Sequence, residues 1–314
     1  MKNAAHLKIV FFGTPDFAVA SLDALVSAGL QVVAVVTAPD KPSGRGLQVN
    51  STPVKQYAEA HNIPVLQPPK LKDPAFLATL QALAADIHIV VAFRMLPQLV
   101  WQMPPMGTVN VHGSLLPQYR GAAPINWAII NGATTTGVTT FRLQHQIDTG
   151  NILLRHAIDI LPQDNAGTLH DKLMLAGAQL LVATVLGLAS NSIAEIPQDS
   201  TSELLQHAPK IFKEDMRIHW AQPAAQVLQL IRGLSPYPAA FATLDNKTIK
   251  IFDAYIAQEQ PSIPTGSYQT DGKSYLRFAT QDAYICILSL QQEGKKRMDI
   301  KAFLSGFKPG QPAL

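Results

Sequence analysis

The sequence predicts an α/β protein in which a domain with a parallel-rich sheet is followed by a small antiparallel β-barrel. Near the N-terminus, two apolar β-rich runs, Leu7–Phe12 and Gln31–Thr37, flank a helical pattern, which is the strand–helix–strand order of a parallel sheet. Later in the chain, short β-rich runs separated by turn residues replace the long helices. The length of 314 residues exceeds the usual size of one hydrophobic core and predicts two domains.

The first helix has its own start and stop signals. Thr14 can cap it, Pro15 suits its first turn, Asp16 complements the helix dipole, and Gly29 ends it. Further helices are expected at Val54–Ala60, Pro74–Ala84 and Ala166–Leu188, and further strands at Ile87–Ala92, Gly107–His112, Val138–Leu143 and Ile152–Ile160. Such alternation builds a Rossmann-like, parallel-rich sheet.

The last third of the chain has a different pattern. One helix is expected at Pro223–Gly233, and the strands that follow it are expected at Phe241–Leu244, Thr248–Ala254, Ser274–Ala279 and Tyr284–Leu290. The turn signals Asp245-Asn246 and Asp271-Gly272 separate these strands. The oligonucleotide-binding (OB-like) barrel is one option for this domain. The polar stretch Asn191–Thr201 suggests domain limits of 1–190 and 208–314, with a linker at 191–207.

Composition and charge restrict the class of protein. Hydrophobic residues make up 47% and charged residues 15% of the chain, as in an ordinary globular protein. Residues 208–314 carry 13 Lys and Arg against 9 Asp and Glu. This mildly basic segment is compatible with a polyanionic partner such as RNA, and a solvated surface with a small excess of lysine is the alternative.

The expected location is the cytoplasm. The single cysteine, Cys286, lies in a strand-like run and excludes an intrachain disulfide; it is expected to be a small buried hydrophobe. The polar segment Met1–Lys8 does not resemble a signal peptide. We see no apolar stretch of the roughly 18 residues that a membrane span requires. We therefore expect no membrane partner.

Three polar residues form a candidate catalytic set. Asn110 and His112 end the strand Gly107–His112, two residues apart, so their side chains point to the same side. Asp148 lies in a polar turn between two apolar strands. Parallel α/β sheets place active sites at the carboxyl ends of their strands, where we expect this set to lie.

An amide, an imidazole and a carboxylate suit acyl transfer to an amine. An amide N–H stabilises a developing oxyanion, an imidazole moves a proton near neutral pH, and a carboxylate orients the imidazole. No Ser or Cys nucleophile is needed, because the attacking amine belongs to the substrate. The alternative is structural: a histidine at a strand end often only satisfies hydrogen bonds, and Asp before Thr-Gly is a common turn residue.

Several segments carry a family resemblance. Asn110–Ile125 (NVHGSLLPQYRGAAPI) resembles the hallmark of the methionyl-tRNA formyltransferases, which are folate-dependent formyltransferases. Phe12–Phe17 and Gln146–Gly150 resemble two other motifs of that family, and Pro39–Gly46 is similar to its tRNA-contacting insertion. The matches follow the family's order, and the expected domain plan extends the resemblance over nearly the whole chain.

The resemblance implies a reaction and a site. The formyl group of 10-formyltetrahydrofolate would pass to the free amino group of initiator methionyl-tRNA, with Asn110, His112 and Asp148 as the catalytic residues and Asp148 supporting His112 directly or through water. The residues that the resemblance assigns to the folate site are Ser114, Leu115, Leu116, Pro117, Phe93, Arg94, Met95 and Leu96. The family more often has Tyr-Gly near Phe93-Arg94, and Arg-Met-Leu is similar to glycinamide ribonucleotide formyltransferases, whose backbone there holds the pterin. For Arg94 the alternative is a solvent-facing loop residue.

Basic residues in two places are candidates for contact with tRNA. By the resemblance, Lys41 and Arg45 would meet the acceptor stem, although the glycines around Arg45 also suit a plain surface turn. The densest basic run, Lys295-Lys296-Arg297, could follow an RNA backbone or form a solvated charge run.

Other functions fit less well. A related enzyme acting on an amino-sugar nucleotide would not need the Lys41–Gly46 loop or the basic barrel. A dinucleotide-dependent oxidoreductase would need a Gly-x-Gly-x-x-Gly loop, which Gly13–Ala18 does not provide. An RNA-binding module without catalysis would leave the polar trio unexplained. We expect no metal, because the histidines do not fall into ligand spacing. We also expect a monomer.

Overall fold

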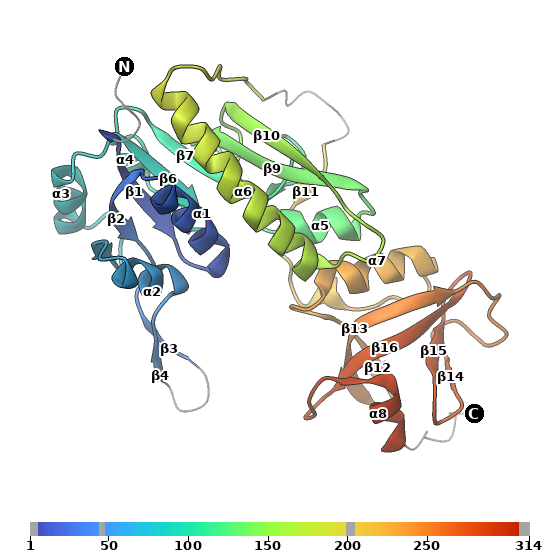
Figure 1. The fold of residues 1–314 in the computed structure, drawn as a ribbon. Helices are drawn as coiled ribbons and strands as arrows, with labels where there is room; N and C mark the ends of the chain where they lie inside the picture. The colour runs from blue at the N-terminus through green and yellow to red at the C-terminus, as the bar shows by residue number, and fades with distance from the viewer. Residues whose placement is uncertain (1–5, 44–47, 199–204, 308–314) are drawn as a thin grey trace. The chain divides into compact units, whose positions relative to one another are not determined.

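The computed structural model describes residues 6–43, 48–198 and 205–307 (Figure 1). The chain forms two compact units, neither of them a continuous stretch. Unit 1 comprises Met1–Gly121, Thr136–Ile158 and His170–His207, and unit 2 comprises Ala122–Thr135, Asp159–Leu169 and Ala208–Leu314. Two short segments from the middle of the sequence therefore join the C-terminal part of the chain.

Unit 1 is built around a seven-stranded sheet in the order β10-β9-β7-β6-β1-β2-β5. Its strands are β1 (Lys8–Gly13), β2 (Gln31–Val36), β5 (Val65–Leu66), β6 (Ile87–Val91), β7 (Thr108–His112), β9 (Thr135–Arg142) and β10 (Ile152–Asp159). The pairs β1–β2, β1–β6, β6–β7 and β2–β5 are parallel, whereas β7 and β9 are antiparallel. The predicted parallel-rich sheet is confirmed.

Helices follow the strands of this sheet. They are α1 (Asp16–Ser27), α2 (Pro53–Ala60), α3 (Pro74–Ala82), α4 (Gln98–Trp101) and α6 (Ala166–Ala189). The predicted capping of α1 is wrong by one residue: Pro15 itself is the N-cap, with no side-chain cap bond, and Asp16 begins the helix. Gly29 ends α1 as predicted, at a φ of 71° that favours glycine.

Helix α6 corrects one expectation. Among the described helices, α6 is long and apolar enough to cross a membrane by length and composition, with a mean hydropathy of 1.7, although we expected no such segment. Leu173, Leu181 and Val185 on this helix are fully buried. A Cβ at Gly177 would lie 3.2 Å from the side chain of Val111 on β7. The helix thus packs on the sheet, as Figure 1 shows, and this contact accounts for its apolar face.

Unit 2 contains a curled antiparallel sheet, which forms a half-barrel. Its strands are β12 (Ala240–Leu244), β13 (Lys247–Ala257), β14 (Tyr268–Thr270), β15 (Leu276–Ala279), β16 (Tyr284–Gln292) and β17 (Met298–Asp299). The order is β12-β13-β16-β15-β14, and β17 pairs with β16. The turn between β12 and β13 has positive φ at Asp245 and Asn246, as the sequence suggested. Cys286 is buried in β16, as expected.

Helices complete unit 2. They are α5 (Pro124–Ile130), α7 (Ala224–Leu234), α8 (Ile300–Ser305) and the short 3-10 helix Glu214–Met216. Asn126 on α5 donates a hydrogen bond from Nδ2 to the carbonyl of Gly233 on α7 at 2.7 Å. A Cβ at Gly233 would lie only 2.5 Å from the side chain of Ile130, so the glycine permits this close helix packing. The described residues also form the short strands β3 (Lys41–Ser43), β4 (Gln48–Asn50), β8 (Arg120–Gly121) and β11 (His207–Ala208).

His88 is buried in the sheet of unit 1. It lies on β6, is 1% exposed, and contacts the ring of Phe12 with 5.2 Å between centroids. Burial lowers the pKa of His88 from 6.5 to about 4, and a backbone hydrogen bond with Val100 opposes this shift. The folded protein therefore keeps His88 neutral at pH values where the unfolded chain takes up a proton.

This burial predicts a loss of stability in acid. The contribution of His88 is complete above pH 6.5 and declines as the pH falls from 6.5 towards 4, by about 3 kcal/mol in total. Urea unfolding across this range should show a shallower pH dependence for His88→Leu than for the wild type. His156→Leu, at an exposed position of the same unit, is the matched control and should keep the wild-type slope. Equal slopes for all three proteins would contradict the prediction.

Candidate active site

The predicted trio comes together in unit 1. Asn110 and His112 lie on β7, and the turn that contains Asp148 approaches the same strand. Nδ1 of His112 and Oδ2 of Asp148 are 3.8 Å apart, and both side chains are largely buried. The separation is longer than a hydrogen bond but short enough for strong electrostatic interaction in a buried setting.

Asp148 reaches this position by a route that we did not expect. Because β9 runs antiparallel to β7, Arg142 at the end of β9 pairs with Val109, away from His112. The loop that follows β9 must run back beside β7 before Asp148 meets His112. Asp148 therefore does not follow a parallel strand along the chain, yet its carboxylate lies beside His112, the last residue of β7, which runs parallel to β6.

The tautomer of His112 follows from the hydrogen-bond partner of its Nε2. Nε2 of His112 lies 2.9 Å from the carbonyl oxygen of Tyr119. A carbonyl only accepts hydrogen bonds, so Nε2 carries the ring hydrogen and donates the hydrogen bond. In the neutral ring, Nδ1 therefore has a free lone pair, and this atom is the one that faces Asp148.

The carboxylate of Asp148 is held by the backbone around it. Oδ2 accepts a hydrogen bond from the N–H of Gly121 at 3.0 Å. Asp148 itself has a φ of 55°, a left-handed conformation that Asp tolerates better than most residues. The side chain of Gln198 donates from Nε2 to the carbonyls of Asp148 and Gly150, at 3.0 and 2.7 Å. The turn is therefore fixed from both sides.

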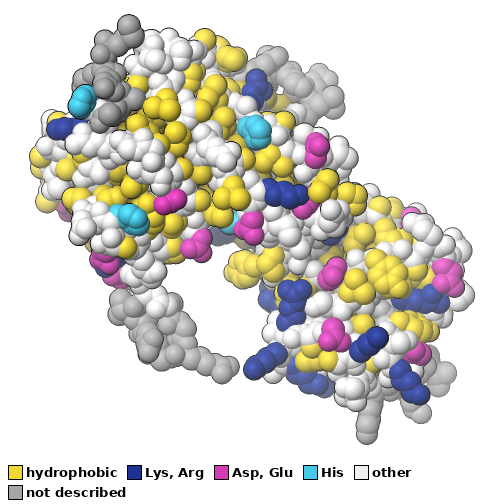
Figure 2. Space-filling model, viewed as in Figure 1, with side chains coloured by type: hydrophobic (Ala, Val, Ile, Leu, Met, Phe, Trp, Pro, Cys, Tyr) yellow, Lys and Arg dark blue, Asp and Glu magenta, His cyan; other side chains and the backbone are white. Residues whose placement is uncertain are grey.

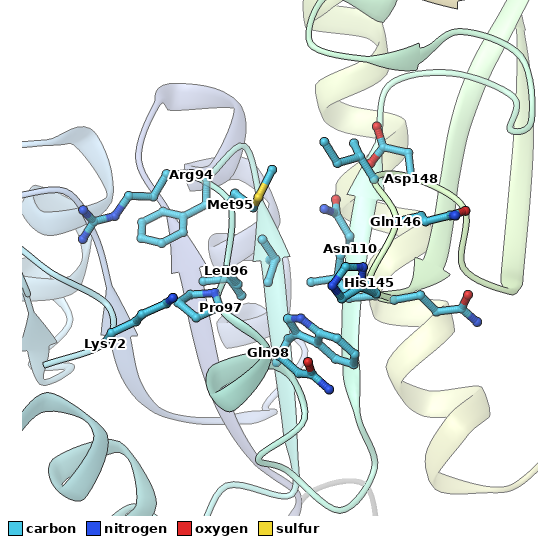
Figure 3. Close-up of a pocket in the computed structure, with 16 residues that line it drawn as sticks. Lys72, Arg94, Met95, Leu96, Pro97, Gln98, Asn110, His145, Gln146 and Asp148 are labelled. Atoms are coloured by element: carbon cyan, nitrogen blue, oxygen red, sulfur yellow. The ribbon is translucent and has the colours of Figure 1, made fainter. Parts of the chain in front are cut away.

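A cavity of about 520 Å³ opens beside the trio (Figure 3). Its lining residues are Lys72, Val90, Phe93, Arg94, Met95, Leu96, Pro97, Gln98, Trp101, Asn110, Leu143, Gln144, His145, Gln146, Ile147 and Asp148. Figure 3 shows Asn110, Gln146 and Asp148 on one side of the cavity and Met95 on the other. The volume suits a drug-sized ligand, and Trp101, Met95 and Ile147 supply apolar surface with polar groups close by.

Phe93, Arg94, Met95 and Leu96 all line this cavity, but they differ in availability. The guanidinium of Arg94 donates to the carbonyl of Pro69 at 3.0 Å and to that of Pro68. Its side chain is therefore engaged with a neighbouring loop and is not simply solvent-facing. Met95 has no such bond in the described structure and is 74% exposed.

Ser114, Leu115, Leu116 and Pro117 do not line the cavity that the structure describes. Ser114 donates from Oγ to the carbonyl of Gln118 at 2.6 Å and accepts at its own carbonyl from Thr139. The N–H of Leu116 donates to Oγ1 of Thr139 at 3.1 Å. These bonds fix the backbone that leads to Tyr119, whose carbonyl accepts the hydrogen bond from His112.

Sequence reasoning missed several residues near the trio. The loop Leu143–Ile147 lines the cavity, as do Lys72, Gln98 and Trp101. A signal for the loop was present, because its polar residues Gln144–Gln146 interrupt two apolar strands. Gln198 had no such signal, since it lies in a polar stretch that resembles a linker.

Lys41, Lys295, Lys296 and Arg297 are not among the residues that line the cavity. Lys41 is exposed at the start of β3, while Arg45 lies outside the described residues. Lys295 and Lys296 are exposed. Arg297 donates from Nε to Oγ of Ser289 at 3.0 Å and lies over the ring of Phe252. On the face seen in Figure 2, Lys and Arg side chains gather on unit 2 with Asp and Glu between them.

No metal site is evident in the part of the chain that the structure describes. Within residues 6–43, 48–198 and 205–307, no group of three or more His, Cys, Asp or Glu side chains could hold a metal ion.

Comparison with known proteins identifies the family. Residues 7–185 match the formyl transferase family, and residues 210–308 match the formyl transferase C-terminal domain. The methionyl-tRNA formyltransferase of Bacteroides thetaiotaomicron is 50% identical over 96% of both chains, and that of Parabacteroides distasonis is 53% identical, also over 96% of both. The chain therefore belongs to the methionyl-tRNA formyltransferase family.

Solved structures share the fold at low sequence identity. An N-formyltransferase from Helicobacter canadensis, solved with folinic acid and dTDP-3-aminofucose, matches with a TM-score of 0.68 and 18% sequence identity. The match includes 93% of this chain and 100% of that enzyme. HypX from Aquifex aeolicus, solved with tetrahydrofolic acid, has a TM-score of 0.67 and 18% identity. There, 97% of this chain spans 49% of HypX, so the match to HypX concerns about half of that protein.

Gly150 tests the constraint on the catalytic turn. A Cβ at this position would lie 1.6 Å from the carbonyl oxygen of Arg142, a backbone atom that cannot move away alone. We expect Gly150→Ala to lower the free energy of unfolding by about 1–3 kcal/mol and to reduce formyl transfer, because the adjacent Asp148 must shift. Chemical denaturation and kcat measure the two effects.

The matched control for this prediction is Gly306→Ala. A Cβ at Gly306 has nothing within 4 Å, so stability and kcat should stay close to the wild type. A fully active Gly150→Ala protein would show that the turn accommodates the methyl group without moving Asp148.

Proposed function

We propose that this chain transfers the formyl group of 10-formyltetrahydrofolate to the free amino group of initiator methionyl-tRNA. The product would be N-formylmethionyl-tRNA for translation initiation. The observation that carries the proposal is the placement of Asn110, His112 and Asp148 together beside a ligand-sized cavity. Relatives about 50% identical over nearly their whole length are named for this reaction, which supports the choice of acceptor.

The cavity beside the trio is the proposed folate site. Its volume and apolar surface suit a pterin ring, and Phe93–Leu96 and Leu143–Ile147 both line it. HypX was solved with tetrahydrofolic acid and the Helicobacter canadensis enzyme with folinic acid, which supports the same ligand class here. We assign Ser114–Pro117 to the border of this site, where their bonds hold the backbone before Tyr119.

The bound folate would supply the formyl group and a leaving nitrogen. Asn110, which lines the cavity, would donate an amide N–H to the oxygen that gains charge as the amine attacks the formyl carbon. Since Nε2 of His112 is engaged with Tyr119, Nδ1 is the atom available to the reaction. It would accept the proton that the attacking amine loses.

Asp148 would then stabilise the charged imidazole. A protonated Nδ1 places a positive charge on His112 3.8 Å from the carboxylate, and the opposite charges attract. His112 would return the proton to the nitrogen that leaves as the new amide bond forms. Proton transfer of this kind contributes about 10²–10⁴-fold to a rate.

Contact with tRNA is assigned to basic residues of both units. We propose that Lys41, Arg45, Lys295, Lys296 and Arg297 meet phosphates or base edges of the tRNA. The excess of Lys and Arg in residues 208–314 supports a polyanionic partner. We also propose a cytoplasmic monomer without a membrane partner, in which 1–190 is catalytic, 191–207 is a linker and 208–314 binds tRNA.

Single-turnover formylation tests the function. Wild-type protein with 10-formyltetrahydrofolate should formylate methionyl-tRNA, and His112→Ala should be about 10²–10⁴-fold slower while still binding folate, because only proton transfer is lost. His156→Ala, at an exposed histidine of the same unit, should react like the wild type. Formylation of an amino-sugar nucleotide instead of methionyl-tRNA would overturn the acceptor. No transfer to either would overturn the function.

Arg45 and Lys41 provide a separate test of tRNA use. Arg45→Ala and Lys41→Ala should each lower kcat/KM for methionyl-tRNA and leave the KM for folate unchanged, because they would remove contacts to tRNA phosphates and none to the folate. The loss should be largest at low salt, where phosphate contacts contribute most. An unchanged kcat/KM for tRNA across salt concentrations would remove these residues from the interface.

A further inference from the structure

The chain segment that follows helix α6 is attached to the catalytic turn. Ile196 exchanges two backbone hydrogen bonds with Ile152 at the start of β10, at 2.8 and 2.9 Å. The neighbouring Glu195 accepts hydrogen bonds from Arg142 at 2.8 Å and from Asn151 at 3.1 Å. These contacts fix the backbone immediately before Gln198.

All the hydrogen-bonding positions of the Gln198 side chain are used. Its Nε2 donates to the carbonyls of Asp148 and Gly150, at 3.0 and 2.7 Å. Its Oε1 accepts from Nε and Nη2 of Arg120, at 3.0 and 2.7 Å. Only this orientation of the amide places donors against carbonyls and an acceptor against a guanidinium. The amide is therefore a specific connector between two loops.

Those two loops hold the two halves of the catalytic pair. Arg120 lies between Tyr119, whose carbonyl accepts from His112, and Gly121, whose N–H donates to Asp148. The other end of the connector is the backbone of Asp148 itself. A displacement of either loop would change the separation between His112 and Asp148.

We infer that Gln198 and Arg120 are positioning residues that set the His112–Asp148 geometry for formyl transfer. The inference rests on the proposed function and extends it to a segment otherwise assigned to the linker. Both residues act through the loops and need not touch a substrate. The amide is required because a carboxylate at residue 198 would keep the bond to Arg120 but place oxygen against the two carbonyls.

Kinetics of Gln198 variants test the inference. Gln198→Ala and Gln198→Glu should lower kcat about 10- to 100-fold, a loss typical of a small misplacement of reacting groups, with the KM for folate changed less than about 3-fold. In an Asp148→Asn background, Gln198→Ala should lower kcat less than about 3-fold, because the group it positions is already gone. Gln179→Glu, at an exposed glutamine on α6, is the matched control and should retain wild-type kcat.

The imidazole of His112 gives a readout that a purely structural role would not change. In ¹⁵N spectra of the protein without substrate, Gln198→Ala and Asp148→Asn should move the His112 Nδ1 resonance in the same direction, and Gln179→Glu should not move it. Equal losses of kcat in both backgrounds, or an unmoved resonance, would overturn the inference. If the wild type transfers no formyl group, the proposed function fails. The His112 Nδ1 resonance of Gln198→Ala would still show whether Gln198 positions the His112–Asp148 pair.

Discussion

The hydrogen bond from His112 to the carbonyl of Tyr119 is the interaction on which the arrangement of the site depends. It assigns the ring proton to Nε2 and turns Nδ1 towards Asp148. Tyr119 has a φ of 58°, a sparsely populated conformation for a bulky residue, which costs about 1–3 kcal/mol. Its N–H donates to the carbonyl of Gln206 at 2.7 Å, so the contacts of the loop offset this strain.

The direction of the strands explains why the site needs a long turn. A parallel neighbour would bring its carboxyl end beside His112 directly, whereas β9 is antiparallel and ends beside Val109. The loop after β9 therefore has to turn back towards His112 at the other end of β7. This return path makes Leu143–Ile147 a wall of the cavity and delivers Asp148 to His112. The same loop thus serves both the proposed folate site and the catalytic pair.

The sequence predicted those parts of the structure that depend on local pattern. The apolar runs located the main strands. Because Asn110 and His112 lie two residues apart on one strand, the sequence also predicted that their side chains share a side of it. Contacts between distant segments had no such signal. Gln198 lies 50 residues from Asp148, and only the folded chain brings them together. The cap of α1 and the apolar face of α6 were misjudged because local preference cannot show which partner each residue meets.

The turn Asp148-Thr149-Gly150 satisfies several constraints within three residues. Asp148 must adopt a left-handed conformation and direct a carboxylate at His112, and Gly150 must leave room for the carbonyl of Arg142. The carbonyls of Asp148 and Gly150 must also face the same amide of Gln198. A larger residue at 150 would push the backbone away from Arg142, and that movement would break the bonds to Gln198. The position of the Asp148 carboxylate therefore depends on the close packing of Gly150 against Arg142.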